Sequence, residues 1–292
     1  MKKAVTLVLA ALLVFSLAAC GGGTSSSSSA AAGSTPASTP ESTPASTPDS
    51  TVSISDEAPG GDDTATTLVL GTSADYPPFE YVDENGEFAG FDIELIQEIS
   101  RRMDLEVEIQ DMPFDSLLAA VQEGKIDLSI SAFNYDEERD QSVDFTEPYY
   151  IAEDAILVAE EFAGTIDAPE QLADYVVGTQ TGTTQDGWVT ENLVDAGLMD
   201  EANLFRYERI DQAALDLQAG RIDAILMESV VARTLAEDMG GLKIVYEGEV
   251  SSGPVNIVIP EGDAELQEAL NEVIAELQEE GFIEDLIVEH MQ

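Results

Sequence analysis

A short sequence pattern occurs twice in this 292-residue chain and constrains its fold more than any other feature. Residues 122–127 read QEGKID, and residues 218–223, 96 positions later, read QAGRID. In both copies a helix-forming segment precedes a glycine that can end the helix, and an apolar strand-like segment follows a basic residue. Because both copies sit inside similar runs of strand and helix patterns, we expect two similarly built lobes.

Alternating strand and helix patterns surround each copy. In the first half, strand patterns at 68–71, 105–109 and 126–131 alternate with helix patterns at 91–103 and from Asp115, which we expect to cap its helix. Asn85-Gly86 predicts a hairpin at 81–88. Such alternation is typical of a parallel sheet covered by helices, so the fold class is predicted to be α/β. Further strands are expected at 155–158, 176–178, 204–207, 242–246 and 255–259, and helices at 169–175, 188–193, 265–280 and 282–288, the last two covering the first sheet.

The first 65 residues have the composition of targeting and linker segments. Lys2 and Lys3 precede an apolar run at 4–19 that is short for a membrane span and has the layout of an export signal. Residues 17–21, LAACG, resemble the lipobox of bacterial lipoproteins, so 1–20 is predicted to be a lipoprotein signal that ends at a lipidated Cys20. An ordinary signal cut elsewhere is the alternative. Residues 21–65, rich in Ser, Thr and Pro, are predicted to be a disordered tether.

The charge of the chain excludes one class of partner. It has 59 acidic and 11 basic residues and a formal net charge of −48. A surface this acidic cannot replace the counterions of a nucleic acid, so no nucleic-acid partner is expected. The acidity fits solubility, a salt-rich habitat or the steering of cationic ligands. Cys20 is the only cysteine, which rules out a disulfide within the chain and any cysteine-based metal site or thiol catalyst.

One arginine stands close to the end of a predicted strand. The strand at 126–131 leads into an acidic segment, expected to be a short helix, that carries Arg139. A guanidinium at the carboxyl end of a strand offers a planar fork of donors suited to a small carboxylate. The alternative is that Arg139 pairs with Asp136, Glu138 or Asp140 on a solvated face, and these residues alone leave both interpretations open.

Six motifs in register resemble a known family. They are YPPFE at 76–80, GFDIEL at 90–95, the Gly-Lys-Ile-Asp strand, EER followed by VDFTEPYY, QTGTT at 180–184 and GRIDAILME at 220–228. In this order, from about Thr66 to Met291, they resemble the family 3 solute-binding proteins of bacterial ABC importers for polar amino acids. The resemblance implies a two-lobed periplasmic-binding-protein architecture of type II, in which each lobe is a β-sheet flanked by helices and two hinge crossovers join them. Lobe 1 would comprise 66–148 and 252–292, and lobe 2 would comprise 149–251.

The resemblance also assigns site residues. They form three groups, for the ligand carboxylate (Arg139, Thr184, Asn134), the ligand ammonium (Glu228, Ser131) and the ligand side chain (Ser73, Asp75, Tyr76, Phe114). Arg139 would bind the ligand carboxylate through two N–H groups, and Tyr76 and Phe114 would form aromatic walls around the aliphatic part of the ligand.

Four positions depart from the family pattern. Glu228 stands where Asp is commoner, Asn134 where Thr or Ser is usual, and Ala132 where Gly is usual. Ser73 replaces an Asp often found in members that select cationic side chains, which argues against lysine or arginine, although Asp75 nearby leaves them open. The resemblance therefore implies an α-amino acid ligand without fixing its side chain.

The expected function is capture of a polar α-amino acid between the lobes and its delivery to an ABC permease. The protein would be a monomer, lipid-anchored outside the cytoplasm, with no cofactor and no metal. Because only contacts that differ between the open and closed states can drive closure, Arg139 and Glu228 are expected on opposite lobes. One alternative is an enzyme on the same fold, similar to cyclohexadienyl dehydratase, with Glu228 as the one proton carrier in the cleft. Another is a sensory or adhesion module. The only histidine, His290, is expected to be a solvated tail residue.

Overall fold

The computed structural model describes residues 67–291. The predicted signal, the lipidation site at Cys20 and the predicted tether lie outside these residues. The described chain forms two large β-sheets and one small one. Among residues 67–291, no helix has both the length and the apolar character that crossing a membrane requires.

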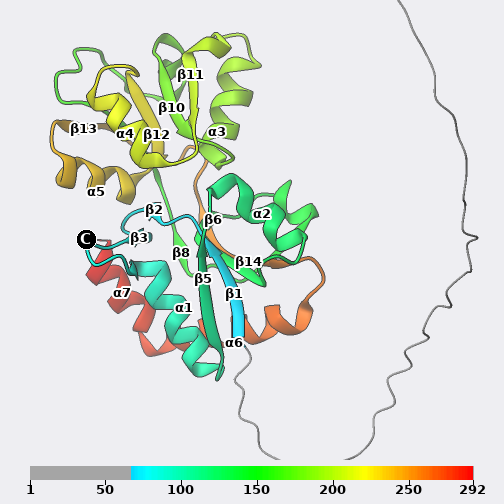
Figure 1. Ribbon diagram of the computed structural model, residues 1–292. Helices are drawn as coiled ribbons and strands as arrows, with labels where there is room; N and C mark the ends of the chain where they lie inside the picture. The colour runs from blue at the N-terminus through cyan, green and yellow to red at the C-terminus, as the bar shows by residue number, and fades with distance from the viewer. Residues whose placement is uncertain (1–66, 292) are drawn as a thin grey trace, which may run out of the picture. The chain divides into compact units, whose positions relative to one another are not determined.

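The first large sheet has the strand order β5-β1-β6-β14-β7, and β8 pairs with β14 (Figure 1). Strands β5, β1 and β6 are parallel, whereas β14 is antiparallel to its partners. We call this sheet and its helices lobe 1. Its elements are β1 (Thr67–Thr72), α1 (Phe91–Arg102), β5 (Glu106–Asp111), α2 (Phe114–Gln122), β6 (Leu128–Asn134), the 3₁₀ helix η1 (Arg139–Gln141), β7 (Val143–Phe145), β8 (Tyr150–Ile151), β14 (Pro254–Pro260), α6 (Ala264–Glu280) and α7 (Phe282–His290).

The second large sheet has the order β11-β10-β12-β9-β13. Three strands are again parallel, and the next strand, β9, is antiparallel to both neighbours. The shared arrangement confirms the prediction of two similarly built α/β lobes. Lobe 2 consists of β9 (Asp154–Ala159), the 3₁₀ helix η2 (Pro169–Asp174), β10 (Val177–Gln180), α3 (Thr184–Val189) with a π-helical turn (Thr190–Val194), the 3₁₀ helix η4 (Glu201–Asn203), β11 (Leu204–Tyr207), α4 (Ile210–Gln218), β12 (Ala224–Glu228), α5 (Ser229–Met239) and β13 (Leu242–Gly248).

The repeated Ile-Asp pair has the same structural role in both lobes. Asp127 accepts a 2.7 Å hydrogen bond from the backbone N–H of Val69 and donates its own N–H to the Val69 carbonyl. Asp223 makes the same two bonds with Val176. Each aspartate therefore joins the start of its own strand to the neighbouring parallel strand, which explains why the motif recurs in both lobes.

A small antiparallel sheet, β2-β3-β4, leads from β1 to α1, and we count it as part of lobe 1. Its strands are β2 (Asp75–Tyr76), β3 (Glu80–Val82) and β4 (Phe88–Ala89), and the turn between β3 and β4 contains the expected Asn85-Gly86 pair. Tyr76 pairs with Glu80 across β2 and β3. This pairing decides which side chains of the segment face lobe 2.

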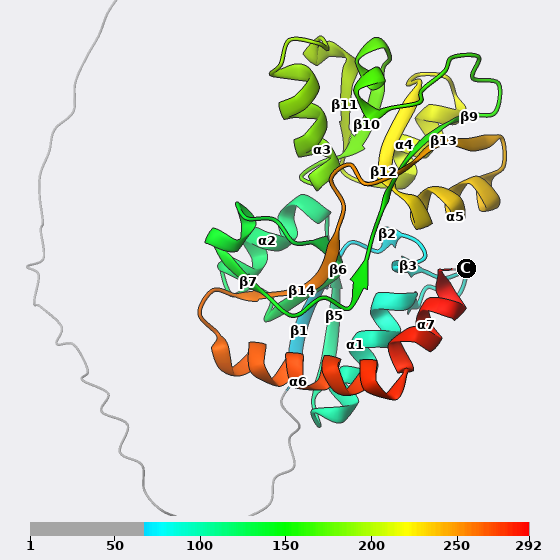
Figure 2. The ribbon, with the colours of Figure 1, turned by 180° about the vertical axis from the view of Figure 1, so that it is seen from behind.

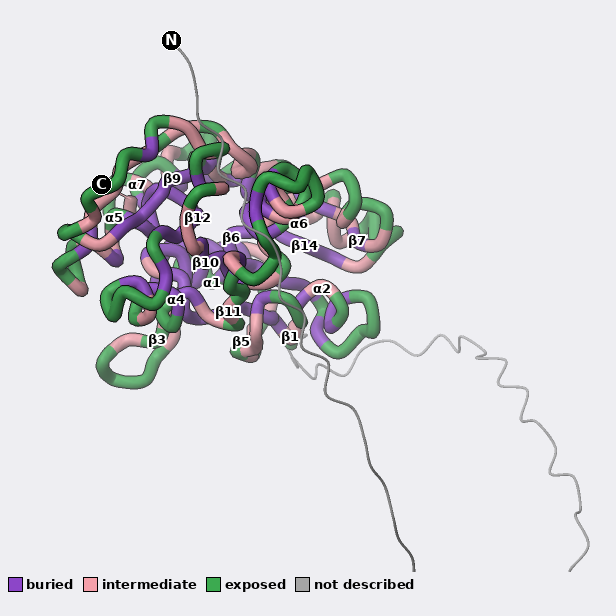
Figure 3. Tube along the Cα trace, turned by 90° about the horizontal axis from the view of Figure 1, so that it is seen from above, coloured by how far each residue is buried: buried purple, intermediate pink, exposed green. Residues whose placement is uncertain are grey.

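Helices cover both faces of each large sheet (Figure 2). On lobe 1, α1, α6 and α7 pack together on one face, as expected for the last two helices, and α2 covers the other. On lobe 2, α4 and α5 pack on one face, and α3 with its π-helical turn packs on the other. The inner strands β6, β9, β10, β12 and β14 are largely buried, whereas the edge strands β5, β11 and β13 are only partly buried and the outer helix surfaces are exposed (Figure 3).

Two segments, 152–153 and 249–253, carry the chain between the large sheets. Asp154, which begins β9 after the first crossover, is fully buried. Its Oδ2 accepts the backbone N–H groups of Val250, Ser251 and Ser252 in the second crossover at 3.1, 2.7 and 2.8 Å. One carboxylate thus ties the two crossovers together.

Several local predictions were wrong. Helix α2 begins at Phe114 after Pro113, so Asp115 lies in the first turn instead of capping the helix, because proline fixes a backbone angle suited to a helix start. The strand predicted at 126–131 runs from Leu128 to Asn134. The short helix that was expected to carry Arg139 is present as a single 3₁₀ turn, Arg139–Gln141. Tyr150–Ile151 pairs with β14, so the first sheet extends past the expected boundary at 148.

Candidate ligand-binding site

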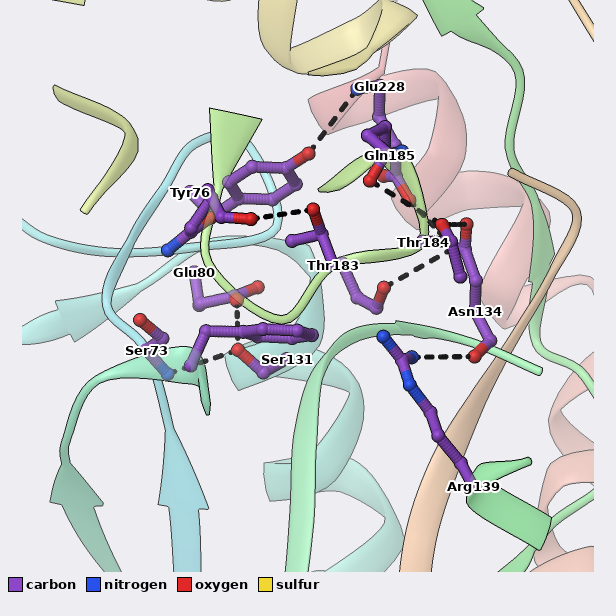
Figure 4. A pocket seen from close by; sticks show the side chains of 13 residues that line it. Ser73, Tyr76, Glu80, Ser131, Asn134, Arg139, Thr183, Thr184, Gln185 and Glu228 are labelled. Atoms are coloured by element: carbon purple, nitrogen blue, oxygen red, sulfur yellow. Dashed lines mark hydrogen bonds between the residues drawn. The ribbon is translucent and has the colours of Figure 1, made fainter. Parts of the chain in front are cut away.

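A cavity of about 320 Å³ lies between the two lobes (Figure 4). Its walls come from segments at the carboxyl ends of β1, β6, β10 and β12, which is where open α/β sheets place their ligands. The residues that line it are Ser73, Tyr76, Glu80, Phe114, Ser131, Ala132, Asn134, Arg139, Gln180, Thr183, Thr184, Gln185 and Glu228.

Local structure directs the Arg139 side chain toward this cavity. Asp136 Oδ1 accepts the backbone N–H groups of Glu138 and Arg139, both at 2.9 Å, and so fixes the 3₁₀ turn. The guanidinium carbon lies 5.7 Å from the ring centres of both Phe114 and Phe133, within the range of cation–π attraction. Burial lowers the pKa of Arg139 from its ordinary value, and an arginine remains a cation under these conditions.

The guanidinium contacts backbone carbonyls from both lobes. Arg139 Nη1 donates to the carbonyl of Asn134 at 3.0 Å, and Nη2 donates to the carbonyl of Gly182 at 2.8 Å. These bonds use two of the five N–H groups of the guanidinium. The sequence left open an ion pair between Arg139 and Asp136, Glu138 or Asp140. In the structure the Arg139 guanidinium bonds these two carbonyls instead.

Glu228 approaches the same cavity from lobe 2. It ends β12, is 2% exposed, and accepts a 2.7 Å hydrogen bond from Asn134 Nδ2 through Oε1. Its Oε2 is buried and has no hydrogen-bond partner within residues 67–291. Burial, together with the charges of Asp154 and Asp92, raises the pKa of Glu228 to about 8. The cavity therefore has a guanidinium from one lobe and an incompletely bonded carboxyl from the other.

A second carboxyl, Glu80, lines the cavity from lobe 1. It is fully buried and accepts a 2.5 Å hydrogen bond from Ser131 Oγ, whereas its Oε2 has no partner in the described part of the chain. Burial and the nearby Asp92 carboxyl raise the pKa of Glu80 well above its ordinary value. Burial also raises the pKa of Asp92 to about 6, against the opposing effect of a hydrogen bond from the Ala132 backbone N–H.

Ala132 explains why glycine is usual at its position. Its φ of 48° lies in the left-handed region, which a side chain disfavours. The 2.8 Å bond from its N–H to Asp92 Oδ2 holds this conformation. The bend places Ser131 and Asn134, on either side of it, against the cavity.

Thr184 and its neighbours form the lobe 2 wall beside Arg139. Thr183 caps α3, because its hydroxyl accepts the N–H of Asp186 at 3.2 Å. Thr184 begins the helix, and its hydroxyl donates to Asn134 Oδ1 at 3.4 Å across the lobes. The helix in this region therefore begins at Thr184, four residues before the helix that the sequence predicts at 188–193.

Ser73 and Tyr76 form the opposite end of the cavity. The Ser73 N–H donates to Ser131 Oγ at 3.1 Å. The Tyr76 hydroxyl oxygen accepts the backbone N–H of Glu228 at 3.3 Å, again across the lobes. Eight of the nine residues expected around the ligand line one cavity; they are Ser73, Tyr76, Phe114, Ser131, Asn134, Arg139, Thr184 and Glu228.

Asp75 is the exception, because it does not line the cavity. Its carboxylate accepts hydrogen bonds from other residues instead, Oδ2 from the Ile210 N–H at 2.6 Å and Oδ1 from Ser73 Oγ at 2.7 Å and Arg209 Nη1 at 3.3 Å. Successive side chains of a strand point to opposite faces, so Asp75 points away where Tyr76 points in.

Besides Ala132, four lining residues were not among the expected site residues: Glu80, Gln180, Thr183 and Gln185. All of them belong to or adjoin the YPPFE and QTGTT motifs, so the motifs marked the right segments. Which side chains of each segment face the cavity depends on pairing that the motifs do not state.

His290 is not the solvated tail residue that was expected. Its side chain is 13% exposed, its Nε2 lies 3.1 Å from Glu94 Oε1, and its ring packs edge-on against Phe91. Glu94 on α1 and Glu289 and His290 on α7 place possible metal-ligating atoms within 4.8 Å of one another. This group lies outside the cavity.

These features define a class of protein. Two α/β lobes, joined by two crossovers, enclose a cavity lined by a guanidinium from one lobe and by carboxyls from both, as in two-lobed solute-binding proteins. The model of the bacterial extracellular solute-binding proteins, family 3, matches residues 68–292, and the chain belongs to this family.

The chain is similar to characterised binding proteins along most of its length. It is 29% identical to the L-cystine-binding protein TcyJ of Escherichia coli over 222 residues, 75% of this chain and 80% of that protein. It is 30% identical to the arginine-binding extracellular protein ArtP of Bacillus subtilis over 230 residues, 78% and 87% of the two chains. An ancestral arginine-binding protein solved with arginine has a TM-score of 0.72 and 34% identity, with 77% and 98% of the two chains covered.

Proposed function

We propose that the protein is the substrate-binding component of an amino acid ABC importer, which captures a polar α-amino acid between its lobes and delivers it to the permease. The observation that carries the proposal is the position of Arg139 and Glu228 on opposite lobes around one buried cavity. The names of the relatives, which bind cystine and arginine, support the amino acid class of the ligand.

The backbone of the ligand would occupy the part of the cavity between Arg139, Thr184 and Glu228. The free N–H groups of the guanidinium and the first N–H groups of α3 can receive the α-carboxylate. Glu228 Oε2, which is buried without a partner in residues 67–291, can accept the α-ammonium, and Ser131 lies on the same wall. A zwitterion thus supplies partners to both lobes at once, which favours the closed state over the open one.

The ligand side chain would point toward Ser73, Glu80 and Gln180, with Tyr76 and Phe114 as aromatic walls. Glu80 Oε2 has no hydrogen-bond partner in residues 67–291, and the raised pKa of Glu80 favours its protonated form at neutral pH. This end of the cavity therefore suits a side chain with a polar group that can share a hydrogen bond with Glu80. An uncharged Glu80 does not reverse the expectation from Ser73, which argues against a lysine or arginine ligand.

The proposed setting is extracytoplasmic. An export signal that ends at a lipidated Cys20, with a Ser/Thr/Pro-rich segment after it, would hold a monomer at the membrane surface near its permease. Binding would occur without turnover. Mass spectrometry after prolonged incubation is then expected to return the ligand unchanged, and prephenate or arogenate likewise, whereas a converted product would contradict the absence of an enzyme activity.

A thermal-shift screen of the twenty amino acids with cystine and ornithine, followed by calorimetry, tests the proposal. A ligand that binds the folded state raises the melting temperature with concentration. Arg139→Ala is expected to weaken binding at least about 100-fold, because the buried α-carboxylate of the ligand would lose the guanidinium that pairs with it. Arg101→Ala is the matched control, since Arg101 pairs with Glu98 on the exposed surface of lobe 1. Unchanged affinity in Arg139→Ala, or no stabilisation by any amino acid, would refute the proposal.

A further inference from the structure

One cluster of charges joins the lobes without lining the cavity. The Asp75 side chain of lobe 1 is 5% exposed and accepts the N–H of Ile210 at 2.6 Å and Arg209 Nη1 at 3.3 Å, both from lobe 2. Arg209 Nη2 donates to Asp111 Oδ2 of lobe 1 at 2.8 Å. The arginine thus lies between two carboxylates of the opposite lobe.

The same cluster reaches two residues of the cavity wall. Ser73 Oγ donates to Asp75 Oδ1 at 2.7 Å, and Gln180 Nε2 lies 3.4 Å from Asp75 Oδ2. Ser73 belongs to lobe 1 and Gln180 to lobe 2, and both line the cavity at the end away from Arg139. Asp75 therefore holds one cavity side chain from each lobe when the lobes are in contact.

The charges explain why this contact favours closure. Asp75 and Asp111 lie close together in an already acidic protein, and Arg209 is positioned to neutralise both. Arginine suits this role because its rigid fork can bond two oxygens in different directions. Opening the lobes would break all three bonds from Arg209 and Ile210 and leave the two carboxylates without their cation.

We propose that Asp75, Asp111 and Arg209 form an interlobe clasp that favours lobe closure independently of the ligand and positions Ser73 and Gln180 at the side-chain end of the cavity. These three are positioning residues, because none of them lines the cavity. The effect on affinity rests on the proposed amino acid binding, whereas the effect on closure does not.

Trp188 provides a reporter in the full chain. It is the only tryptophan, and it lines an open groove between the lobes together with Leu118 and Tyr135 of lobe 1. Separation of the lobes would widen this groove and increase the access of small quenchers to the half-exposed indole ring. Acrylamide quenching of Trp188 therefore measures how far the ligand-free protein is closed, without any label.

Arg209→Met removes the charge and keeps much of the apolar stem. In the ligand-free protein it is expected to increase the quenching of Trp188, and saturating ligand is expected to restore the wild-type value. The amino acid identified by the thermal screen should bind about tenfold more weakly and dissociate faster. Arg209→Lys should recover only part of the effect, since a single ammonium lacks the fork that bonds both carboxylates.

Arg233→Met is the matched control, because Arg233 pairs with Glu247 inside lobe 2 and makes no bond to lobe 1 among the described residues. It should leave quenching and affinity at wild-type values. The clasp is refuted if ligand-free Arg209→Met shows the same Trp188 quenching as wild type and Arg233→Met. Failure of wild-type protein to bind any amino acid would instead refute the proposed function, and the ligand-free quenching comparison would still decide the clasp.

Discussion

Asn134 on lobe 1 donates a 2.7 Å hydrogen bond to Glu228 on lobe 2, so an uncharged amide is the nearest partner of the buried acid. A neutral partner leaves the charge of Glu228 uncompensated, and burial accordingly raises the pKa of this carboxyl to about 8. An arriving ammonium would supply the missing countercharge. A ligand ammonium at this oxygen would therefore favour the ionised carboxylate, and its binding would release the proton that burial keeps on Glu228 near neutral pH.

Glu228→Gln is expected to separate ligand binding from folding. The glutamine keeps the size of the side chain but cannot carry the charge that attracts an ammonium, so amino acid affinity should fall by roughly 100-fold. Titration calorimetry measures this loss. Glu237→Gln, an exposed acid on α5, should bind as wild type does. Equal affinity in the two variants would remove Glu228 from the ammonium site.

The raised pKa of Glu228 predicts how stability depends on pH. Its folded pKa of about 8 lies above the ordinary value of 4.5, so between these values the folded state binds a proton that the unfolded state has lost. Stability of the ligand-free protein should therefore fall as pH rises from about 5 to 8, by an amount on the order of 4 kcal/mol for this group.

Asp92, with a pKa raised to about 6, adds to this decline at the lower end of the range. Urea unfolding at a series of pH values measures the slope, and Glu228→Gln should make it shallower. A slope that is identical in wild type and Glu228→Gln would show that Glu228 titrates in the folded state as it does in the unfolded state.

Much of the fold and most of the site were predictable because their determinants are local. Hydrophobic periodicity located the strands and helices, and the motifs placed Arg139, Thr184 and Glu228 at strand or helix ends where the cavity forms. The family resemblance, rather than periodicity, supplied the roles of these residues.

The errors at Asp75 and Glu80 have one physical cause. Tyr76 pairs with Glu80 across β2 and β3, so these two side chains lie on the same face and both line the cavity. Asp75 is adjacent to Tyr76 in the strand and points to the other face. The register of these two short strands depends on the turn between them and on packing against lobe 2. A local pattern of residues does not contain that information.

Ala132→Gly is expected to stabilise the protein. The φ of 48° at Ala132 costs an L-residue on the order of 1 kcal/mol, and glycine adopts it freely, although its greater unfolded-state entropy offsets part of the gain. Denaturant unfolding should therefore show a higher midpoint with an unchanged slope. Ala119→Gly, at an exposed position inside α2, should lower stability by about 1 kcal/mol. Destabilisation by both substitutions would mean that Ala132 is not under backbone strain.

The two repeated aspartates are expected to make matching contributions to the two lobes. Asp127→Ala and Asp223→Ala each remove the acceptor for one backbone N–H, that of Val69 or Val176, at an exposed site, so each should cost about 1 kcal/mol. The asparagine variants keep an acceptor oxygen and should lose less. Hydrogen exchange of the Val69 and Val176 amides distinguishes the lobes, because each alanine variant should speed exchange only at its own partner. If either substitution accelerated both amides equally, the aspartates would act on global stability and not as separate clamps between neighbouring strands.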